Sequence, residues 1–194
     1  MTEPGLVVLF PAMLDLRGRS VLVVGGGRIA ARKAAALVES GAEVTCVAPV
    51  IGDEVRALGV RTLERGYRSG EVAHGYWLVF VATDDPTVQR QVYDDGVAHR
   101  VWVNAADDPS NCSFILPAVH RNGPVVVAVS TSGAAPALAS WLRSRLAGAI
   151  PANIAGIAEE LAERRAAVRR DGRSTEDIDW VPIIEAMVEA PVKW

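Results

Sequence analysis

A glycine-rich turn is the clearest chemical feature of the sequence, and its residues are Gly25-Gly26-Gly27-Arg28-Ile29-Ala30. In a strand-to-helix turn of this pattern, Gly25 makes the tight turn and Gly27 lets a pyrophosphate approach the backbone, while Ala30 lets the helix pack on the strand. The amide groups at the helix N-terminus then face the phosphates. The pattern predicts a dinucleotide site, with Arg28 and Ile29 beside the phosphates. The alternatives are a purely structural turn and, for Arg28, a solvated helix charge.

The acidic residue that commonly follows the second strand of such a site is missing, because this strand ends Cys46-Val47-Ala48-Pro49. We therefore expect the adenine ribose to be held by backbone groups near Pro49 and Val50, or by a side chain from elsewhere. The residues alone leave the preference between NAD and NADP open.

Polar residues follow two later strands, as Thr83-Asp84-Asp85 and as Asn104-Ala105-Ala106-Asp107-Asp108. Strand ends line the ligand crevice of an open parallel sheet, so both segments are expected to face the nicotinamide. An aspartate there can take a proton while hydride leaves the substrate. The alternative is that these aspartates are only helix caps and turn residues. That alternative is favoured for Asp84 and Asp85, and both interpretations stay open for Asp107.

Strands that alternate with helices must position these residues, which indicates an α/β, Rossmann-type, doubly wound parallel sheet. The expected strands of the sheet are 20–24, 44–48, 60–64, 77–82 and 101–104, and the expected helices are 29–40, 53–58 and 87–99. After Asp108 the pattern changes to short strands at 114–119 and 125–130, with a turn at 121–124, and to helices at 136–147, 152–170 and 178–189.

Composition excludes several classes of protein. The chain has 194 residues, of which 50% are hydrophobic, enough for a substantial core, and its net charge of −3 gives no general field for nucleic acid. Cys46 and Cys112 lack metal-ligand spacing, so no metal site is expected. No signal peptide and no membrane span is expected either, which favours a cytoplasmic protein.

Several motifs in order resemble the siroheme synthase family, and most closely its precorrin-2 dehydrogenase module. They are Phe10–Gly18, Val23–Lys33, Ala82–Asp85, Val103–Asp107, Phe114–Ala118 and Val129–Ala139. The resemblance covers residues 10 to about 146, whereas the helical tail matches only in general character. It adds to the fold a small strand-helix dimerisation segment and a helical C-terminal tail, with expected domains 1–113, 114–150 and 151–194.

The resemblance implies a homodimeric, NAD-dependent enzyme that oxidises precorrin-2 to sirohydrochlorin in siroheme or other modified tetrapyrrole biosynthesis. It assigns the catalytic aspartate to Asp107, as general base, with Thr83 and Asn104 expected at the cofactor. Some family members also insert Fe2+ into sirohydrochlorin, so a bifunctional enzyme is one alternative. The methyltransferase domain of fused members is expected to be absent, since the sequence stops at Trp194.

Precorrin-2 carries eight carboxylates, so its site needs cations and backbone donors. The turn Ser130-Thr131-Ser132-Gly133 precedes a predicted helix and supplies hydroxyl and amide groups, and Arg143 lies further along that helix. These five residues are the predicted substrate contacts. The alternative for the turn is a simple Ser/Thr helix cap. In parts of the family a hydroxyl at the position of Thr131 is modified by phosphate, which would repel an anionic substrate.

A function of another class is a non-catalytic NAD(H)-sensing regulatory protein, which uses a similar glycine turn. The Ser130 turn and the helical tail argue against it. A sensor would bind NAD(H) and leave every tetrapyrrole unchanged.

Overall fold

The computed structural model describes residues 8–106 and 108–189, and its internal contacts divide the chain into two compact units, 1–115 and 116–194. The three-part division expected from the sequence, with boundaries after residues 113 and 150, stays a prediction.

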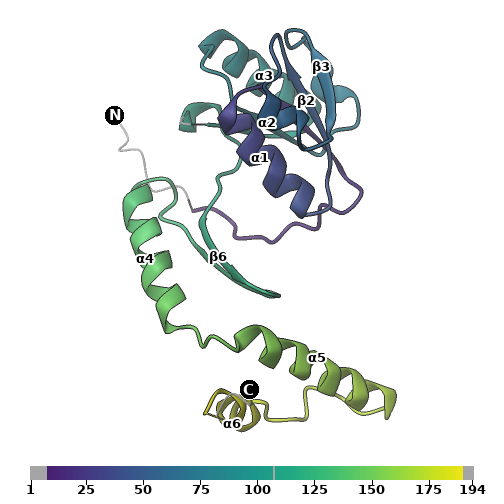
Figure 1. Cartoon of the computed structure of the whole chain (residues 1–194), viewed down its shortest axis with the longest axis vertical. Helices are drawn as coiled ribbons and strands as arrows, with labels where there is room; N and C mark the ends of the chain where they lie inside the picture. Colours follow the sequence, from purple (N-terminus) through teal and green to yellow (C-terminus); the bar gives the residue numbers. More distant parts are fainter. Residues whose placement is uncertain (1–7, 107, 190–194) are drawn as a thin grey trace. The chain divides into compact units, whose positions relative to one another are not determined.

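The first unit is built on a five-stranded parallel sheet in the order β3-β2-β1-β4-β5. Two of its strands, β2 and β3, are labelled in Figure 1. Its strands are β1 (Ser20–Val24), β2 (Glu43–Ala48), β3 (Arg61–Glu64), β4 (Leu78–Val81) and β5 (Trp102–Ala105). The chain runs outward from β1 in one direction to β3, and then crosses to β4 on the other side. This strand order confirms the predicted Rossmann-type sheet. In such sheets ligands bind where the order reverses, at the carboxyl ends of the strands, which here are those of β1 and β4.

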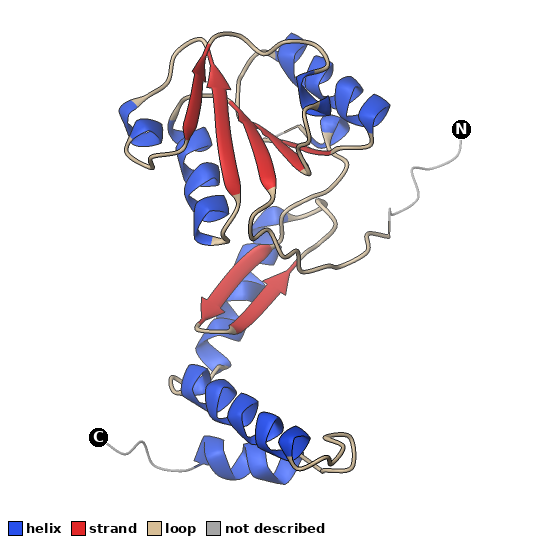
Figure 2. Ribbon diagram, turned by 90° about the vertical axis from the view of Figure 1, so that its right-hand side faces the viewer, coloured by secondary structure: helices blue, strands red, loops and turns tan. Residues whose placement is uncertain are grey.

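Helices cover both faces of this sheet (Figure 2). On one face, α1 (Arg28–Glu39) and α2 (Asp53–Arg56) pack their apolar side chains on alternate residues of β1, β2 and β4. On the other face lie α3 (Pro86–His99) and the 3₁₀ turn η1 (Glu71–Ala73). Burial on both faces explains why the central strands read as unbroken apolar runs.

Polar contacts hold the segment between β3 and β4, which contains no long helix. The Arg65 guanidinium donates to both carboxylate oxygens of Glu71, at 3.0 and 2.5 Å. On α3, the Asp95 carboxylate accepts from the Tyr67 hydroxyl at 2.8 Å and from the Gly70 amide at 2.7 Å. These bonds close the segment over the sheet in place of a second crossover helix.

The second unit contains the antiparallel pair β6 (Ala118–Asn122) and β7 (Val125–Val129), followed by α4 (Pro136–Ala149), α5 (Ile154–Arg170) and α6 (Val181–Glu189). Helix α4 packs against both strands, and α6 packs against α5. The predicted order of elements after Asp108 is therefore confirmed.

Some predicted boundaries in the later part of the chain are wrong. The strand expected at 114–119 begins only at Ala118, because the Phe114 ring packs edge-on against Phe80 at 5.5 Å and Pro117 has no N–H for a ladder. The final helix begins at Val181 rather than at residue 178, because the Asp179 carboxylate accepts from the Val181 amide at 3.1 Å and holds a turn just before the helix. Helix α5 begins at Ile154, after a turn that Pro151 opens.

Candidate functional site

The first glycine of the turn is required by its backbone and by its surroundings. Gly25 follows the last residue of β1 with φ at 144°, a conformation that L side chains rarely adopt. A Cβ at this position would lie 2.3 Å from the carbonyl oxygen of Ala82, just beyond β4. Gly25 therefore lets β1 turn tightly against the end of the neighbouring strand.

The second glycine has a role that the sequence pattern did not indicate. A Cβ on Gly26 would lie 2.0 Å from the carbonyl oxygen of Val50, and the Gly52 amide donates to the Gly26 carbonyl at 2.8 Å. Gly26 thus joins the turn to the loop after β2. This contact becomes visible only when the two segments are placed together in the fold. The sequence hint for it is that three glycines occur in a row, one more than the dinucleotide pattern needs at this point.

The third glycine leaves open space. Gly27 is exposed, and a Cβ built on it meets no heavy atom within 4 Å apart from its chain neighbours. It is the N-cap of α1, whose first turn holds no acidic residue. Since first-turn amide groups have no partner within a helix, this terminus presents donors and a partial positive charge to an anion. The arrangement fits a dinucleotide pyrophosphate.

The flanking residues support the same location. Arg28 and Ile29 are exposed on the first turn of α1, whereas Ala30 is fully buried against the sheet. Pro49 and Val50 are exposed directly after β2, on the loop that Gly26 contacts. Their contacts with an adenine ribose stay a prediction.

Beyond β4, the predicted cap is present. The Asp85 carboxylate accepts from the Thr87 amide at 2.8 Å and so caps α3. The Thr83 hydroxyl accepts from the Asp85 amide at 3.3 Å, whereas Asp84 is exposed. Asp85 therefore has a structural role, and Thr83 lies at the carboxyl end of β4 beside the turn at Gly25.

A hydrogen-bonded group joins α1, β5 and the loop at Phe114. Lys33 of α1 donates to the Asn104 side-chain oxygen at 3.3 Å, and the Asn104 amide donates to the Phe114 carbonyl at 3.0 Å. The Lys33 ammonium also lies 5.2 Å from the centre of the Phe80 ring. Asn104 is 7% exposed, so its amide is fixed in place at the end of β5. Sequence reasoning assigned no role to Lys33.

Asp107, the predicted catalytic residue, lies outside the described residues. Its neighbour Asp108 accepts hydrogen bonds from Ser110 and Asn111, and these bonds lower the pKa of the Asp108 carboxyl. Asp108 caps the short turn η2 (Pro109–Asn111). It is therefore a structural residue next to the predicted base.

In the second unit, the predicted substrate turn is a compact hydrogen-bonded loop. The Thr131 hydroxyl accepts from the Ala135 amide at 3.0 Å, and the Ser130 hydroxyl accepts from the Ser132 amide at 3.1 Å. Ser132 and Gly133 both have positive φ, at 54° and 85°. The loop leads into α4, which begins at Pro136. The N-cap of α4 is Ala135 and no side chain caps the helix, so the Ser/Thr cap expected as an alternative is absent from this turn. Carboxylate binding by the turn stays a prediction.

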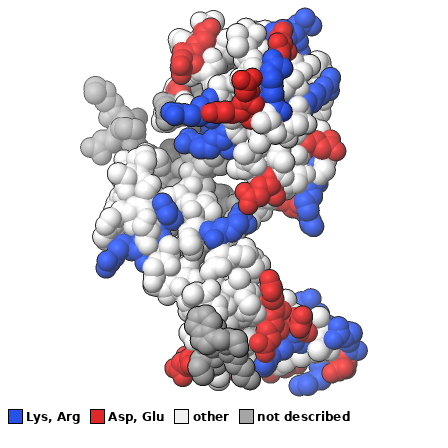
Figure 3. All heavy atoms as spheres, viewed as in Figure 1, with Lys and Arg blue, Asp and Glu red and all other residues white. Residues whose placement is uncertain are grey.

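Charge along the second unit is unevenly distributed. The sequence contains no Asp or Glu between Asp108 and Glu159, whereas Arg121, Arg143 and Arg145 occur there. In Figure 3 the surface around α4 is mostly uncharged with scattered basic residues. Arg143 is half-buried on α4, and Arg145 lies over the Trp141 ring at 5.7 Å. This acid-free stretch is visible in the sequence itself.

Two further findings concern the described residues alone. Within 8–106 and 108–189, no group of three or more His, Cys, Asp or Glu side chains could hold a metal ion. In the same ranges no helix is both long and apolar enough to cross a bilayer. The metal-insertion alternative stays a prediction, because its metal ion would be a substrate.

Comparisons with known proteins agree with this geometry. Residues 12–118 match a family described as "Putative NAD(P)-binding", and residues 122–149 match one described as "Sirohaem biosynthesis protein central". The first match supports NAD as the cofactor of the glycine-rich turn.

Similar proteins include siroheme synthases from Nitrosococcus oceani, 37% identical over 92% of this chain, and from Azotobacter vinelandii, 43% identical over 82%. The chain spans 39% and 35% of the lengths of these two relatives. Among solved structures, "SirC, precorrin-2 dehydrogenase" is 28% identical with a TM-score of 0.73, and the match covers 93% of this chain and 90% of that one. The chain therefore belongs to the putative NAD(P)-binding family.

Proposed function

We propose that this protein is an NAD-dependent dehydrogenase that oxidises precorrin-2 to sirohydrochlorin. The observation that carries the proposal is the pairing of a turn shaped for a dinucleotide with likeness to a precorrin-2 dehydrogenase along nearly the whole chain. The cofactor site is supported by the open space at Gly27 and by the absence of Asp and Glu from the first turn of α1. The pyrophosphate would lie at the glycine-rich turn, against Gly25, Gly27, Arg28, Ile29 and Ala30. The nucleosides would lie against Pro49, Val50, Thr83 and Asn104.

The reaction removes two electrons and two protons from the substrate. When bound, NAD+ accepts the hydride. The Asp107 carboxylate would take the proton released from the neighbouring position of the substrate and pass it to water. Asp107 comes two residues after the end of β5 in the sequence, and the ends of parallel strands are where such sheets bind ligands, which supports this role.

The second unit would bind the substrate carboxylates. Hydroxyl and amide groups would come from the turn Ser130, Thr131, Ser132 and Gly133, and a positive charge would come from Arg143. The lack of acidic residues between Asp108 and Glu159 supports this assignment, because a polyanion meets no fixed negative charge along that stretch.

We also propose a homodimer. Large apolar side chains are exposed in the second unit, among them Leu116 at 54%, Trp141 at 58% and Val181 at 60%. Exposed side chains of this size support an interface in this unit, and the short pair β6–β7 has edges that a partner strand would cover.

Replacing Asp107 tests the assignment of the base. Asp107→Ala is expected to lower the rate of NADH formation from precorrin-2 by about 10²–10⁴-fold, with NAD+ affinity unchanged, since a general base contributes about that much. The matched control is Asp84→Asn, an exposed aspartate after β4 with no structural hydrogen bond among the described residues. Equal rates for Asp107→Ala and the wild type would remove Asp107 from the mechanism.

A further inference from the structure

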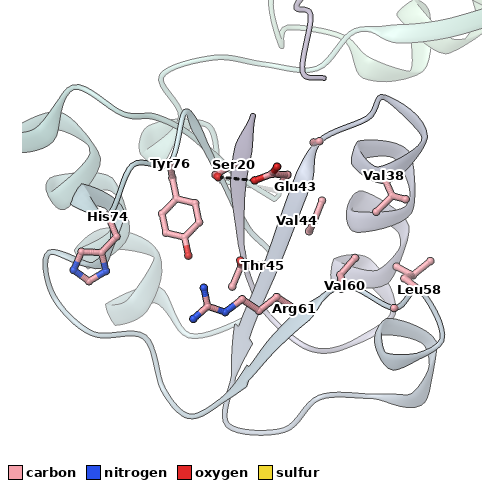
Figure 4. Close-up of a pocket in the computed structure, with 12 residues that line it drawn as sticks. Ser20, Val38, Glu43, Val44, Thr45, Leu58, Val60, Arg61, His74 and Tyr76 are labelled. Atoms are coloured by element: carbon pink, nitrogen blue, oxygen red, sulfur yellow. Dashed lines mark hydrogen bonds between the residues drawn. The ribbon is translucent and has the colours of Figure 1, made fainter. Parts of the chain in front are cut away.

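A cleft of about 490 Å³ lies in the first unit, at the edge of the sheet opposite to the glycine-rich turn (Figure 4). It is lined by residues at the starts of strands: Ser20 begins β1 and Arg61 begins β3, whereas Gly25 follows the end of β1. Strand β2 starts at Glu43 but pairs with β3 only from Thr45 onward, so its first residues extend past β3 beside the cleft. The cleft is thus separate from the proposed dinucleotide site.

Hydrogen-bond donors form one side of this cleft. They are the side chains of Thr45, Arg61, His74 and Tyr76. Thr45 is only 6% exposed, and no residue within 8–106 or 108–189 hydrogen-bonds to its hydroxyl or to the other three side chains. Figure 4 shows the Arg61 side chain and the Tyr76 hydroxyl directed toward one another beside Thr45. Arg61 and His74 are exposed to solvent, and Thr45 and Tyr76 line the cleft beside them, so these donors are available to a ligand.

The opposite side is apolar, with Val38, Leu58 and Val60 (Figure 4). The acidic side chain in the lining, Glu43, accepts from the Ser20 hydroxyl at 3.4 Å and lies away from Arg61 in this view. The cleft therefore combines an apolar wall with a wall of donors. Small-molecule sites have this character, and their volumes are roughly 300–1,000 Å³.

We propose that this cleft binds a small organic anion, a carboxylate or a phosphate ester with an apolar body. The guanidinium of Arg61 offers the paired N–H groups that match two oxyanion oxygens. The hydroxyls of Thr45 and Tyr76 donate to the same group, and His74 adds a donor at the mouth. The apolar body of the ligand lies against Val38, Leu58 and Val60.

The test is a titration of the full-length chain, saturated with NAD+, with benzoate, phenyl phosphate and the uncharged benzyl alcohol. Amide chemical shifts locate each ligand. We expect benzoate or phenyl phosphate to shift the amides of Thr45, Arg61 and Tyr76, with benzyl alcohol binding at least about tenfold more weakly because it lacks the charge. Tighter binding of benzoate assigns the site to carboxylates, and tighter binding of phenyl phosphate assigns it to phosphate esters.

Variants sharpen the test. Arg61→Gln is expected to weaken binding of the preferred anion at least about tenfold, and the near-isosteric changes Thr45→Val and Tyr76→Phe several-fold. Arg68→Gln, an exposed arginine outside the cleft, is the matched control and binds as the wild type does. The proposal is overturned if benzyl alcohol binds as tightly as the anions, if the shifts lie at Gly25–Ala30, or if Arg61→Gln and Arg68→Gln bind alike.

Discussion

At the scale of single residues, three consecutive glycines perform three different tasks. Gly25 allows the backbone to turn, Gly26 allows contact with the loop after β2, and Gly27 leaves the space that a phosphate would fill. The tasks of Gly25 and Gly27 could be predicted from the sequence, because a strand-to-helix turn is a local structure. The task of Gly26 could not, because it depends on where Val50 lies after folding.

Two alanine substitutions separate folding from binding at this turn. Gly25→Ala is expected to lower the free energy of unfolding by about 2–3 kcal/mol or more, because the methyl group collides with the Ala82 carbonyl at a φ that alanine avoids. Gly27→Ala is expected to leave stability within about 1 kcal/mol of the wild type, since its backbone is extended and the space is open. It is expected to weaken NAD+ binding at least about tenfold by filling the phosphate space.

Urea unfolding and NAD+ titration of both variants provide the measurements. A Gly27→Ala protein that binds NAD+ like the wild type would mean that no phosphate approaches this position.

At the scale of elements, the central strands were predictable because burial on both faces makes each an apolar run. The strand at Ala118 was misplaced because Phe114, which belongs to the same apolar run in sequence, packs on Phe80 of the first unit's sheet. The local sequence pattern cannot reveal whether Phe114 continues the strand or packs on Phe80. The Lys33–Asn104–Phe114 group was missed for the same reason, since its members come from three separate segments.

The segment between β3 and β4 depends on the ion pair of the buried Glu71 carboxylate with the partly exposed Arg65 guanidinium, and its stability is expected to vary with pH. Burial by itself would raise the pKa of Glu71, but hydrogen bonds from the Arg65 side chain and the Arg68 amide outweigh it, so the pKa is lowered. Because the folded pKa lies below the unfolded one, this carboxylate contributes stability above the unfolded pKa and loses it as pH falls through the folded value.

Glu71→Gln is therefore expected to lower the free energy of unfolding by about 3 kcal/mol at neutral pH, since Glu71 is 3% exposed, and by less in acid. Asp94→Asn, in an exposed pair with Arg90, is the control and changes stability by under about 1 kcal/mol. Urea unfolding at a series of pH values measures both. An equal loss for Glu71→Gln at every pH would show that the carboxylate charge is not what stabilises the segment.

At the scale of the whole molecule, we expect the protein to form a homodimer in solution. Sedimentation equilibrium should give twice the mass of one chain, because the exposed apolar side chains of the second unit need a partner surface. Trp141→Glu is expected to shift the equilibrium toward the monomer, whereas Val97→Glu, at a 61% exposed position on α3, is the control. A wild-type protein that stays monomeric at micromolar concentration would contradict the dimer.

The central claim is the oxidation of precorrin-2 with NAD+ as hydride acceptor. Its most direct test is to mix the full-length protein anaerobically with precorrin-2 and NAD+ and to follow NADH and sirohydrochlorin absorbance together. The expected result is one NADH per sirohydrochlorin, with no product when NAD+ is omitted. Tight NAD+ binding without any change in the tetrapyrrole would contradict the claim and would favour a nucleotide sensor.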